Sequence, residues 1–127
     1  MQKYEVKGSI LGFENTKSVE IIEIDNLFST IRDVDNKNIS FTVVNPYELR
    51  EYSFDIAPDV QKLLNIKDNS KLSTYNVVVI QNPLESSIIN FLAPFVINND
   101  NMTIAQIILD PERHPDFGMT ETIKSFV

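Results

Sequence analysis

The chain has 127 residues, enough for one domain, which we expect to span residues 1–127. It contains no cysteine, which excludes disulfides, thiolate metal ligands and cysteine nucleophiles. With 11 Lys and Arg against 18 Asp and Glu, the formal net charge is −7. A charge of that sign disfavours direct binding to nucleic acid or to anionic membranes, and it favours either a basic protein partner or simply solubility.

The beginning of the chain has no feature of a secreted or membrane protein. The first ten residues, MQKYEVKGSI, lack the apolar core of a signal peptide. Apolar runs such as Val77 to Ile80 are far shorter than the roughly 20 residues that span a bilayer. We therefore expect a cytoplasmic protein with no membrane contact.

The first half of the chain has the two-residue periodicity of β-strands, with mostly β-branched or aromatic apolar residues. Strands are predicted at 3–7, 19–24, 28–32 and 39–44, with a polar turn at 33–38. The clearest alternation lies at 50–56, where Tyr52, Phe54 and Ile56 share one face. This segment is predicted to be a strand with one side facing the core.

The second half contains one helical segment and further strands. The helix is predicted to begin near Pro58, because a proline in the first turn lacks only an N–H that would have no intrahelical partner. Strands are predicted at 71–81, 88–92, 95–98 and 103–109, followed by a loop-like tail from residue 111 and a short ordered end at 120–126. The strand at 71–81 is expected to be central because Val77–Ile80 is apolar on both faces. A polar cluster at 98–101 indicates a hairpin turn. The fold class is therefore mainly β, a small antiparallel β-barrel-like domain with one short helix.

Two motifs could carry metal or catalytic chemistry. Residues 33–38 resemble the start of a calcium loop, but position six holds Asn38 and not Gly, and position twelve holds Val44 and not Glu. We favour a polar hairpin turn there. His114 is the single histidine and cannot alone form a zinc site or a catalytic triad, so we expect an exposed tail residue. No catalytic, metal-binding or cofactor-binding residue is predicted, and we expect a protein that is not an enzyme.

Several residues remain as candidates for contact with a protein partner. The densest acidic stretch contains Glu48, Glu51, Asp55 and Asp59. It is interpreted as a solvated face or as a docking face for a basic or amphipathic partner. A pair of catalytic carboxylates is the less favoured alternative. Proline–aromatic pairs at 46–47 and 94–95 are typical of exposed apolar anchors, with core packing as the alternative. The candidate protein-binding residues are Pro46, Tyr47, Glu48, Glu51, Asp55, Pro94, Phe95 and Asn98.

The block Ile88–Asn98, INFLAPFVIN from Ile89 onward, resembles the most recognisable segment of the flagellar assembly factor FliW family. The strand residues 106–109 (QIIL), the segment 10–14 (ILGFE) and the segment 41–47 (FTVVNPY) resemble other elements of that family in the expected order. The residues from 115 to the end do not match the family pattern.

This resemblance implies a β-barrel-like protein with two protein partners. One is flagellin, bound through its C-terminal helical region. The other is the CsrA dimer, an RNA-binding repressor of flagellin mRNA translation, which FliW sequesters by contacting it away from its RNA-binding surface. FliW thereby relieves repression until newly made flagellin takes it away. The alternative from another class is a β-barrel that binds a small ligand, which would require an apolar pocket with few polar groups.

Overall fold

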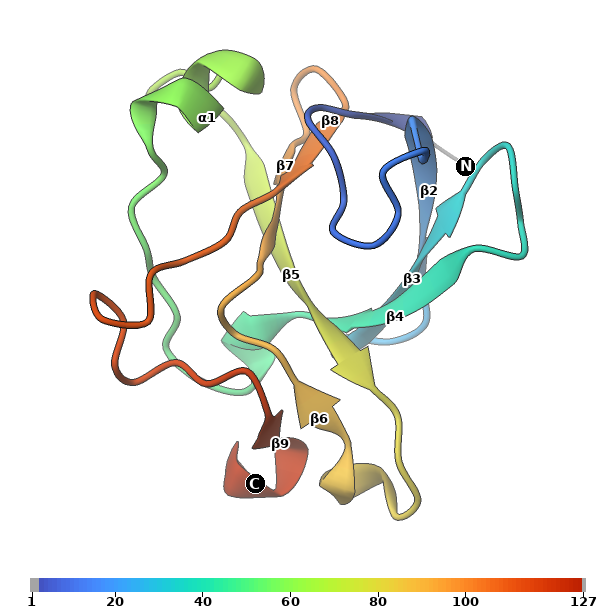
Figure 1. Ribbon diagram of the computed structural model, residues 1–127, viewed down its shortest axis with the longest axis vertical. Coiled ribbons are helices and arrows are strands. Elements are labelled where there is room, and N and C mark those ends of the chain that lie inside the picture. The colour runs from blue at the N-terminus through green and yellow to red at the C-terminus, as the bar shows by residue number, and fades with distance from the viewer. Residues whose placement is uncertain (1–2, 127) are drawn as a thin grey trace.

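A computed structural model describes residues 3–126, so Met1, Gln2 and Val127 of the expected domain lie outside the described residues (Figure 1). Its centre is a closed barrel of seven strands. The strands are β1 (Lys3–Val6), β2 (Ser18–Glu23), β3 (Phe28–Asp33), β4 (Ser40–Val44), β5 (Leu72–Val79), β7 (Phe95–Asn98) and β8 (Thr103–Gln106). Their order is β4-β3-β2-β1-β8-β7-β5, and pairing of β4 with β5 closes the barrel. The β1–β8 pair is parallel, while the other six barrel pairs are antiparallel.

A second, smaller sheet extends the barrel at one end. The last residues of β5 pair with β6 (Ile88–Ile89), which in turn pairs with β9 (Glu121–Thr122). The helix α1 (Pro58–Leu63) lies at the other end of the molecule (Figure 1). Three short 3-10 helices complete the fold: η1 (Pro46–Glu48), η2 (Leu84–Ser86) and η3 (Ile123–Phe126).

The hydrophobic core has three parts. The barrel interior is filled by side chains that include Val19, Ile31, Val43, Phe95, Ile97 and Ile104. A second cluster lies under the C-terminal tail and includes Val44, Tyr52, Val78, Ile89, Phe91 and Ile123. A third lies on the outer side of β7 and β8 and includes Leu64, Leu92, Val96, Ala105, Ile107 and Leu109. Strands β7 and β8 therefore bury both of their faces, which explains the apolar run Phe95–Ile97 in β7.

Most predicted elements are confirmed. Each barrel strand overlaps its predicted range, and β7 and β8 form the expected hairpin around residues 99–102. The predicted central position of β5 is confirmed, since β5 pairs with β4, β6 and β7. The helix begins at Pro58 as predicted. The end at 120–126 is ordered as β9 and η3.

The predicted strand at 50–56 is wrong, although its alternation is real. Tyr52 is buried and Phe54 and Ile56 are half-buried, while the intervening residues are exposed. The segment pairs with no described strand; instead the Tyr52 hydroxyl donates a hydrogen bond to the Phe91 carbonyl at 2.6 Å. The pattern therefore reflects one-sided contact with the core, which produces the same periodicity as a half-buried strand.

The apolar run Val77–Ile80, from which the central position was predicted, is not buried throughout. Val79 and Ile80 are exposed, although Val79 pairs with Ile88 of β6. The predicted strand 88–92 shortens to two residues, since the chain turns at Phe91 toward β7. Both differences lie at the same end of the molecule.

Candidate protein-binding surfaces

The two proline–aromatic pairs have opposite environments. Tyr47 is 56% exposed, as expected for an anchor, but Phe95 is 0% exposed inside the barrel. The expectation that Phe95 is an exposed anchor is therefore wrong, because β7 is enclosed by β5 and β8 and covered on both faces.

Three other candidate residues are buried as well and have roles in the fold. Pro94 is buried, and Asn98 is buried with its amide donating to the Leu64 carbonyl at 2.9 Å. Pro46 is also buried, at the first position of η1, where proline is favoured because its N–H would have no partner. These three side chains support the fold and do not form an exposed surface.

The remaining candidates form an acidic strip, defined here as Glu48, Glu51 and Asp55, all exposed. Arg50 lies within the strip but forms its ion pair with Glu121 at 3.5 Å. Within residues 3–126, no ion pair involves a carboxylate of the strip. The strip carboxylates are therefore exposed and lack an ion-pair partner in the described part of the chain, although Glu51 borders a cleft that Arg50 and Arg113 also line.

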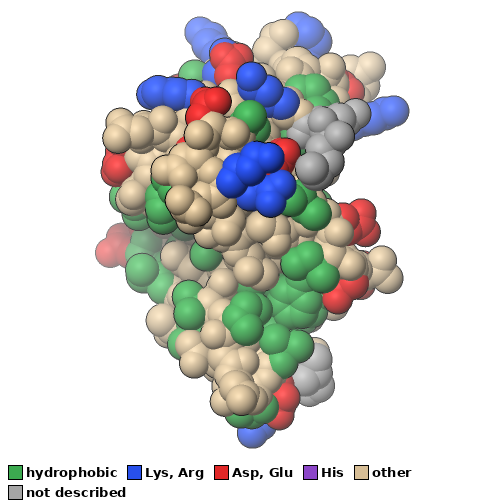
Figure 2. Space-filling model, turned by 90° about the vertical axis from the view of Figure 1, so that its right-hand side faces the viewer, with side chains coloured by type: hydrophobic (Ala, Val, Ile, Leu, Met, Phe, Trp, Pro, Cys, Tyr) green, Lys and Arg blue, Asp and Glu red, His purple; other side chains and the backbone are tan. Residues whose placement is uncertain are grey.

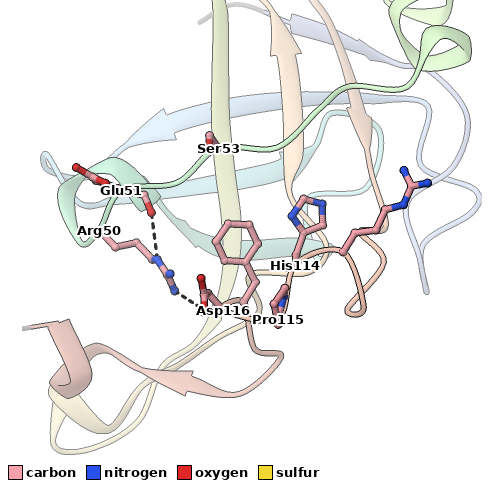
Figure 3. A pocket seen from close by; sticks show the side chains of 8 residues that line it. Arg50, Glu51, Ser53, His114, Pro115 and Asp116 are labelled. Carbon is pink, nitrogen blue, oxygen red and sulfur yellow. Dashed lines mark hydrogen bonds between the residues drawn. The ribbon is translucent and has the colours of Figure 1, made fainter.

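Arg50 fastens the C-terminal tail to the segment that carries the strip (Figure 3). Its Nε donates to the Glu51 carbonyl and its Nη1 donates to the Asp116 carbonyl, both at 3.2 Å. The guanidinium also lies 4.9 to 5.4 Å from the ring centroids of Phe117, Phe91 and Phe126. A planar cation among aromatic rings combines hydrogen bonding with cation–π attraction. Sequence reasoning missed this role, because Asp116 and Glu121 lie 66 and 71 residues away along the chain.

A polar cleft of about 370 Å³ lies beside Arg50 and is bordered by Glu51, Ser53, Arg113 and His114 (Figure 3). The expectation of an exposed His114 needs correction. Its ring is half-buried and stacks on Phe117 at a centroid distance of 5.4 Å and an interplanar angle of 4°. His114 thus stabilises a turn within the tail, where the Phe117 N–H also donates to the His114 carbonyl at 3.1 Å.

An apolar cup lies at the rim of the barrel where β5 leaves it. The cup encloses about 460 Å³, and its lining includes Leu11, Phe13, Phe41, Val79, Ile88 and Met119. Leu11 is 71% exposed, Met119 61%, Val79 56% and Phe13 38%, so four large apolar side chains of the lining face solvent. Figure 2 shows hydrophobic side chains gathered on the lower half of the molecule, the half that holds β6 and β9, with most charged side chains above. Sequence analysis did not find this cup, because its walls come from segments that are distant along the chain.

The polar turn between β3 and β4 is organised by the buried carboxylate of Asp33. This carboxylate accepts hydrogen bonds from the Thr16 hydroxyl at 2.8 Å and from the N–H groups of Asp35 and Asn36 at 2.8 and 3.2 Å. Burial acts to raise the pKa of Asp33, but these hydrogen bonds outweigh it and hold the pKa below its usual value. Residues 33–38 thus form the polar hairpin turn that we favoured, and no group of three or more potential metal ligands is found among the described residues.

Tyr52 is a buried tyrosine whose pKa is strongly raised. Burial raises the pKa of its hydroxyl to about 12, although a hydrogen bond from the Asn76 amide acts in the opposite direction. The hydroxyl donates to a carbonyl and accepts from an amide, so it serves as a structural link between the strip segment and β5.

Fold and surfaces together define a class: a small β-barrel protein whose candidate sites are an acidic strip and an apolar cup. No helix among residues 3–126 is long and apolar enough to cross a membrane. The model of the family described as FliW protein matches residues 1–121, so the match extends into residues 115–121, where the sequence pattern indicated none. The chain belongs to the FliW family of flagellar assembly factors.

Individual relatives agree with this assignment. Flagellar assembly factor FliW 1 of Wolinella succinogenes is 47% identical over 124 residues, covering 98% of this chain and 97% of the relative. Flagellar assembly factor FliW of Campylobacter lari is 39% identical over 124 residues, with 97% and 95% covered. A crystal structure of the flagellar assembly factor FliW superposes with a TM-score of 0.86 at 19% identity, covering 95% of this chain and 84% of the other. This structural likeness confirms the β-barrel fold predicted from the sequence.

Proposed function

We propose that this protein acts in the cytoplasm as a partner switch that binds flagellin and the CsrA dimer in turn. Binding to CsrA relieves repression of flagellin mRNA translation, and newly made flagellin displaces CsrA and restores repression. The observation that carries the proposal is membership of the FliW family over nearly the whole chain. The unpaired acidic strip and the exposed apolar cup supply two surfaces of different chemistry for two partners.

Flagellin is assigned to the apolar cup. The C-terminal region of flagellin, which the family resemblance names as the bound part, is amphipathic and unpolymerised before export. An apolar cup with four exposed large side chains can shield such a segment from water. Deleting the C-terminal region of flagellin should abolish the complex in a pull-down with purified proteins. Undiminished binding of the truncated flagellin would reject this assignment.

CsrA is assigned to the acidic strip. RNA-binding proteins carry basic surfaces, and the strip offers exposed carboxylates that form no ion pair within residues 3–126. Reversing two charges with Glu48→Lys and Glu51→Lys should slow association with CsrA several-fold at low salt. The difference should shrink near 0.5 M salt, where the Debye length is only about 4 to 5 Å.

The matched control reverses two exposed carboxylates elsewhere, Asp35→Lys on the β3–β4 turn and Glu85→Lys on η2. Both double variants change the net charge by the same amount. A difference between their association rates therefore reports where the reversed charges lie. Equal association rates for both double variants at low salt would remove the strip from the CsrA interface. Flagellin binding should change less than CsrA binding in the strip variant, because the cup is mainly apolar.

The alternative function, a small-ligand-binding barrel, has less support. Side chains such as Phe95, Ile97 and Ile104 fill the barrel interior, so the volume available to a ligand is the cup on its rim. The cup opens to solvent through Leu11 and Met119, whereas ligand pockets bury most of the ligand surface.

A further inference from the structure

The strand that contains β8 continues beyond Gln106, but it is paired on one side only. The Ile107 N–H donates to the Pro94 carbonyl at 2.9 Å, and the Leu109 N–H donates to the Leu92 carbonyl at 2.7 Å. In an antiparallel pair, alternate residues direct their main-chain groups to the same neighbour. The N–H and C=O of Ile108 and the N–H of Asp110 therefore point to the opposite side.

On that opposite side the neighbouring strand has already ended. The parallel register of β1 with β8 stops at Val6 and Ile104, and the last hydrogen bond runs from the Lys7 N–H to the Ile104 carbonyl at 2.8 Å. Among residues 3–126, no main-chain hydrogen bond reaches Ile108. Residues 106–110 thus form an open edge, which is a template for pairing with another chain.

The open edge adjoins the apolar cup. Gln106 belongs to both, and its side-chain Oε1 accepts a hydrogen bond from the Leu11 N–H at 2.8 Å, which fixes the loop that walls the cup. Ile108, at the middle of the open edge, is 64% exposed. Because side chains of a strand alternate between its two faces, every second side chain of an added strand would face the cup.

The charges around the open edge indicate the chemistry of the added strand. Asp110 and Glu112 lie at its end, and Glu14 lies on the loop that walls the cup; all three are exposed. In the described part of the chain none of them forms an ion pair. Two cations lie nearby: Arg113 in sequence, and Lys7, which directly follows β1 and pairs with Glu5 at 3.2 Å. These acidic side chains favour a partner strand that is flanked by basic residues. It disfavours a second copy of the same chain, because each copy carries a net charge of −7.

We infer that the open edge 106–110 binds an extended segment of a partner protein, which adds a strand beside β8, places alternate apolar side chains in the cup and carries basic residues at its flanks. Taking flagellin as the source of this segment rests on the proposed function. The mode of binding itself depends only on the open edge and the cup. It requires the bound part of the partner to be extended and not helical where it meets Ile108.

The test uses the full chain and two probes: flagellin, and a synthetic peptide of alternating valine and threonine with a lysine at each end. Ile108→Pro removes the N–H on the open edge and leaves the N–H groups of Ile107 and Leu109 in place. Ile108→Ala is the matched control, since it removes the side chain and keeps the N–H. Fluorescence anisotropy should show that the proline variant weakens binding of both probes by roughly tenfold or more relative to the alanine variant.

Hydrogen exchange on the unmodified protein gives a second measurement that needs no variant. The amides of Ile108 and Asp110 should exchange rapidly in the free protein and slow down with the peptide bound, whereas those of Ile107 and Leu109 should be protected in both states. Unchanged exchange at Ile108 in the peptide complex, or no binding of the peptide, would overturn the inference.

The outcomes separate this inference from the proposed function. If flagellin binds the wild type and both variants equally, the open edge is rejected and the proposed function stands. If the peptide binds in the expected way while flagellin does not bind at all, the open edge stands and flagellin is rejected as the partner. If sedimentation shows a dimer that Ile108→Pro dissociates, the open edge pairs with a second copy, and the inference of a separate partner is overturned.

Discussion

The pairs Pro46–Tyr47 and Pro94–Phe95 have the same local chemistry and opposite positions in the fold. Pro94–Phe95 opens a barrel strand that has neighbours on both edges and cores on both faces. Pro46–Tyr47 begins a 3-10 turn outside the barrel, and the segment after it pairs with no described strand. In both pairs, a proline beside an aromatic residue marks a bend in the chain. The number of strands around the bend decides whether the aromatic ring lies in the core or on the surface.

The largest expected effect comes from Phe95→Ala. Phe95 is fully buried and stacks on Phe41 with a centroid distance of 6.2 Å, so its removal leaves a cavity inside the barrel. The free energy of unfolding should fall by roughly 3 to 5 kcal/mol, measured by urea denaturation. A loss below about 1 kcal/mol would mean that β7 is not held as a core strand.

The next largest loss of stability is expected at Arg50, which holds the segment after Tyr47 in the absence of strand pairing. Arg50→Met keeps the length of the side chain but removes the hydrogen bonds to two carbonyls, the ion pair with Glu121 and the cation–π contacts. We expect a loss of roughly 1 to 3 kcal/mol in the free energy of unfolding. Limited proteolysis should then cut the tail after residue 111 faster than in Glu112→Gln, a surface control. Equal cleavage rates would show that Arg50 does not hold the tail.

Tyr52→Phe tests the other attachment of this segment. The change leaves the Phe91 carbonyl without its donor and the buried Asn76 amide with one partner fewer, so stability should fall by roughly 1 to 2 kcal/mol near pH 7. Phe54→Leu, a change at the next inward-facing position, should cost less because it removes no hydrogen bond.

Tyr52→Phe also tests how the free energy of unfolding depends on pH. The pKa of Tyr52 is raised to about 12 in the folded protein, so its neutral hydroxyl stabilises the fold fully below the ordinary tyrosine pKa of 10.0. That contribution is lost as pH rises from about 10 to 12, at up to roughly 1.4 kcal/mol per pH unit. Denaturation across this window should therefore show a steeper decline for the wild type than for Tyr52→Phe. Parallel declines would show that the hydroxyl does not remain neutral when folded.

The smallest loss of stability is expected at Tyr47, the exposed aromatic residue of the two pairs. Tyr47→Ala should lower the free energy of unfolding by less than about 1 kcal/mol, because the ring is mostly exposed and its hydroxyl makes one long hydrogen bond of 3.4 Å to Thr74. Under the proposed function, the same variant should weaken partner binding measured by calorimetry. A loss of stability as large as that of Phe95→Ala would place Tyr47 in the core and remove it as an anchor.

The sequence by itself determined the strands, the helix start at Pro58 and the fold class. Period-two alternation and turn residues are local signals, so they can be read without knowing which strands become neighbours. Burial of Phe95, Pro94 and Asn98 was decided by the tertiary structure, because the barrel interior covers one face of β7 and the cluster around Leu64 covers the other. The same holds for residues 50–56, where a local pattern predicted a strand and the closed barrel offered no edge to pair with.

Only the tertiary structure produced the candidate surfaces. The exposure of Glu51 and Asp55 follows from the local alternation at 50–56 and was predicted, but only the tertiary structure shows that Arg50 pairs with Glu121 and not with a carboxylate of the strip. The apolar cup joins Leu11, Val79 and Met119, and the open edge exists because β1 ends beside Ile104 while the strand containing β8 runs on to Leu109. Such features depend on where separate strands end relative to one another, and no local pattern in the chain records that relation.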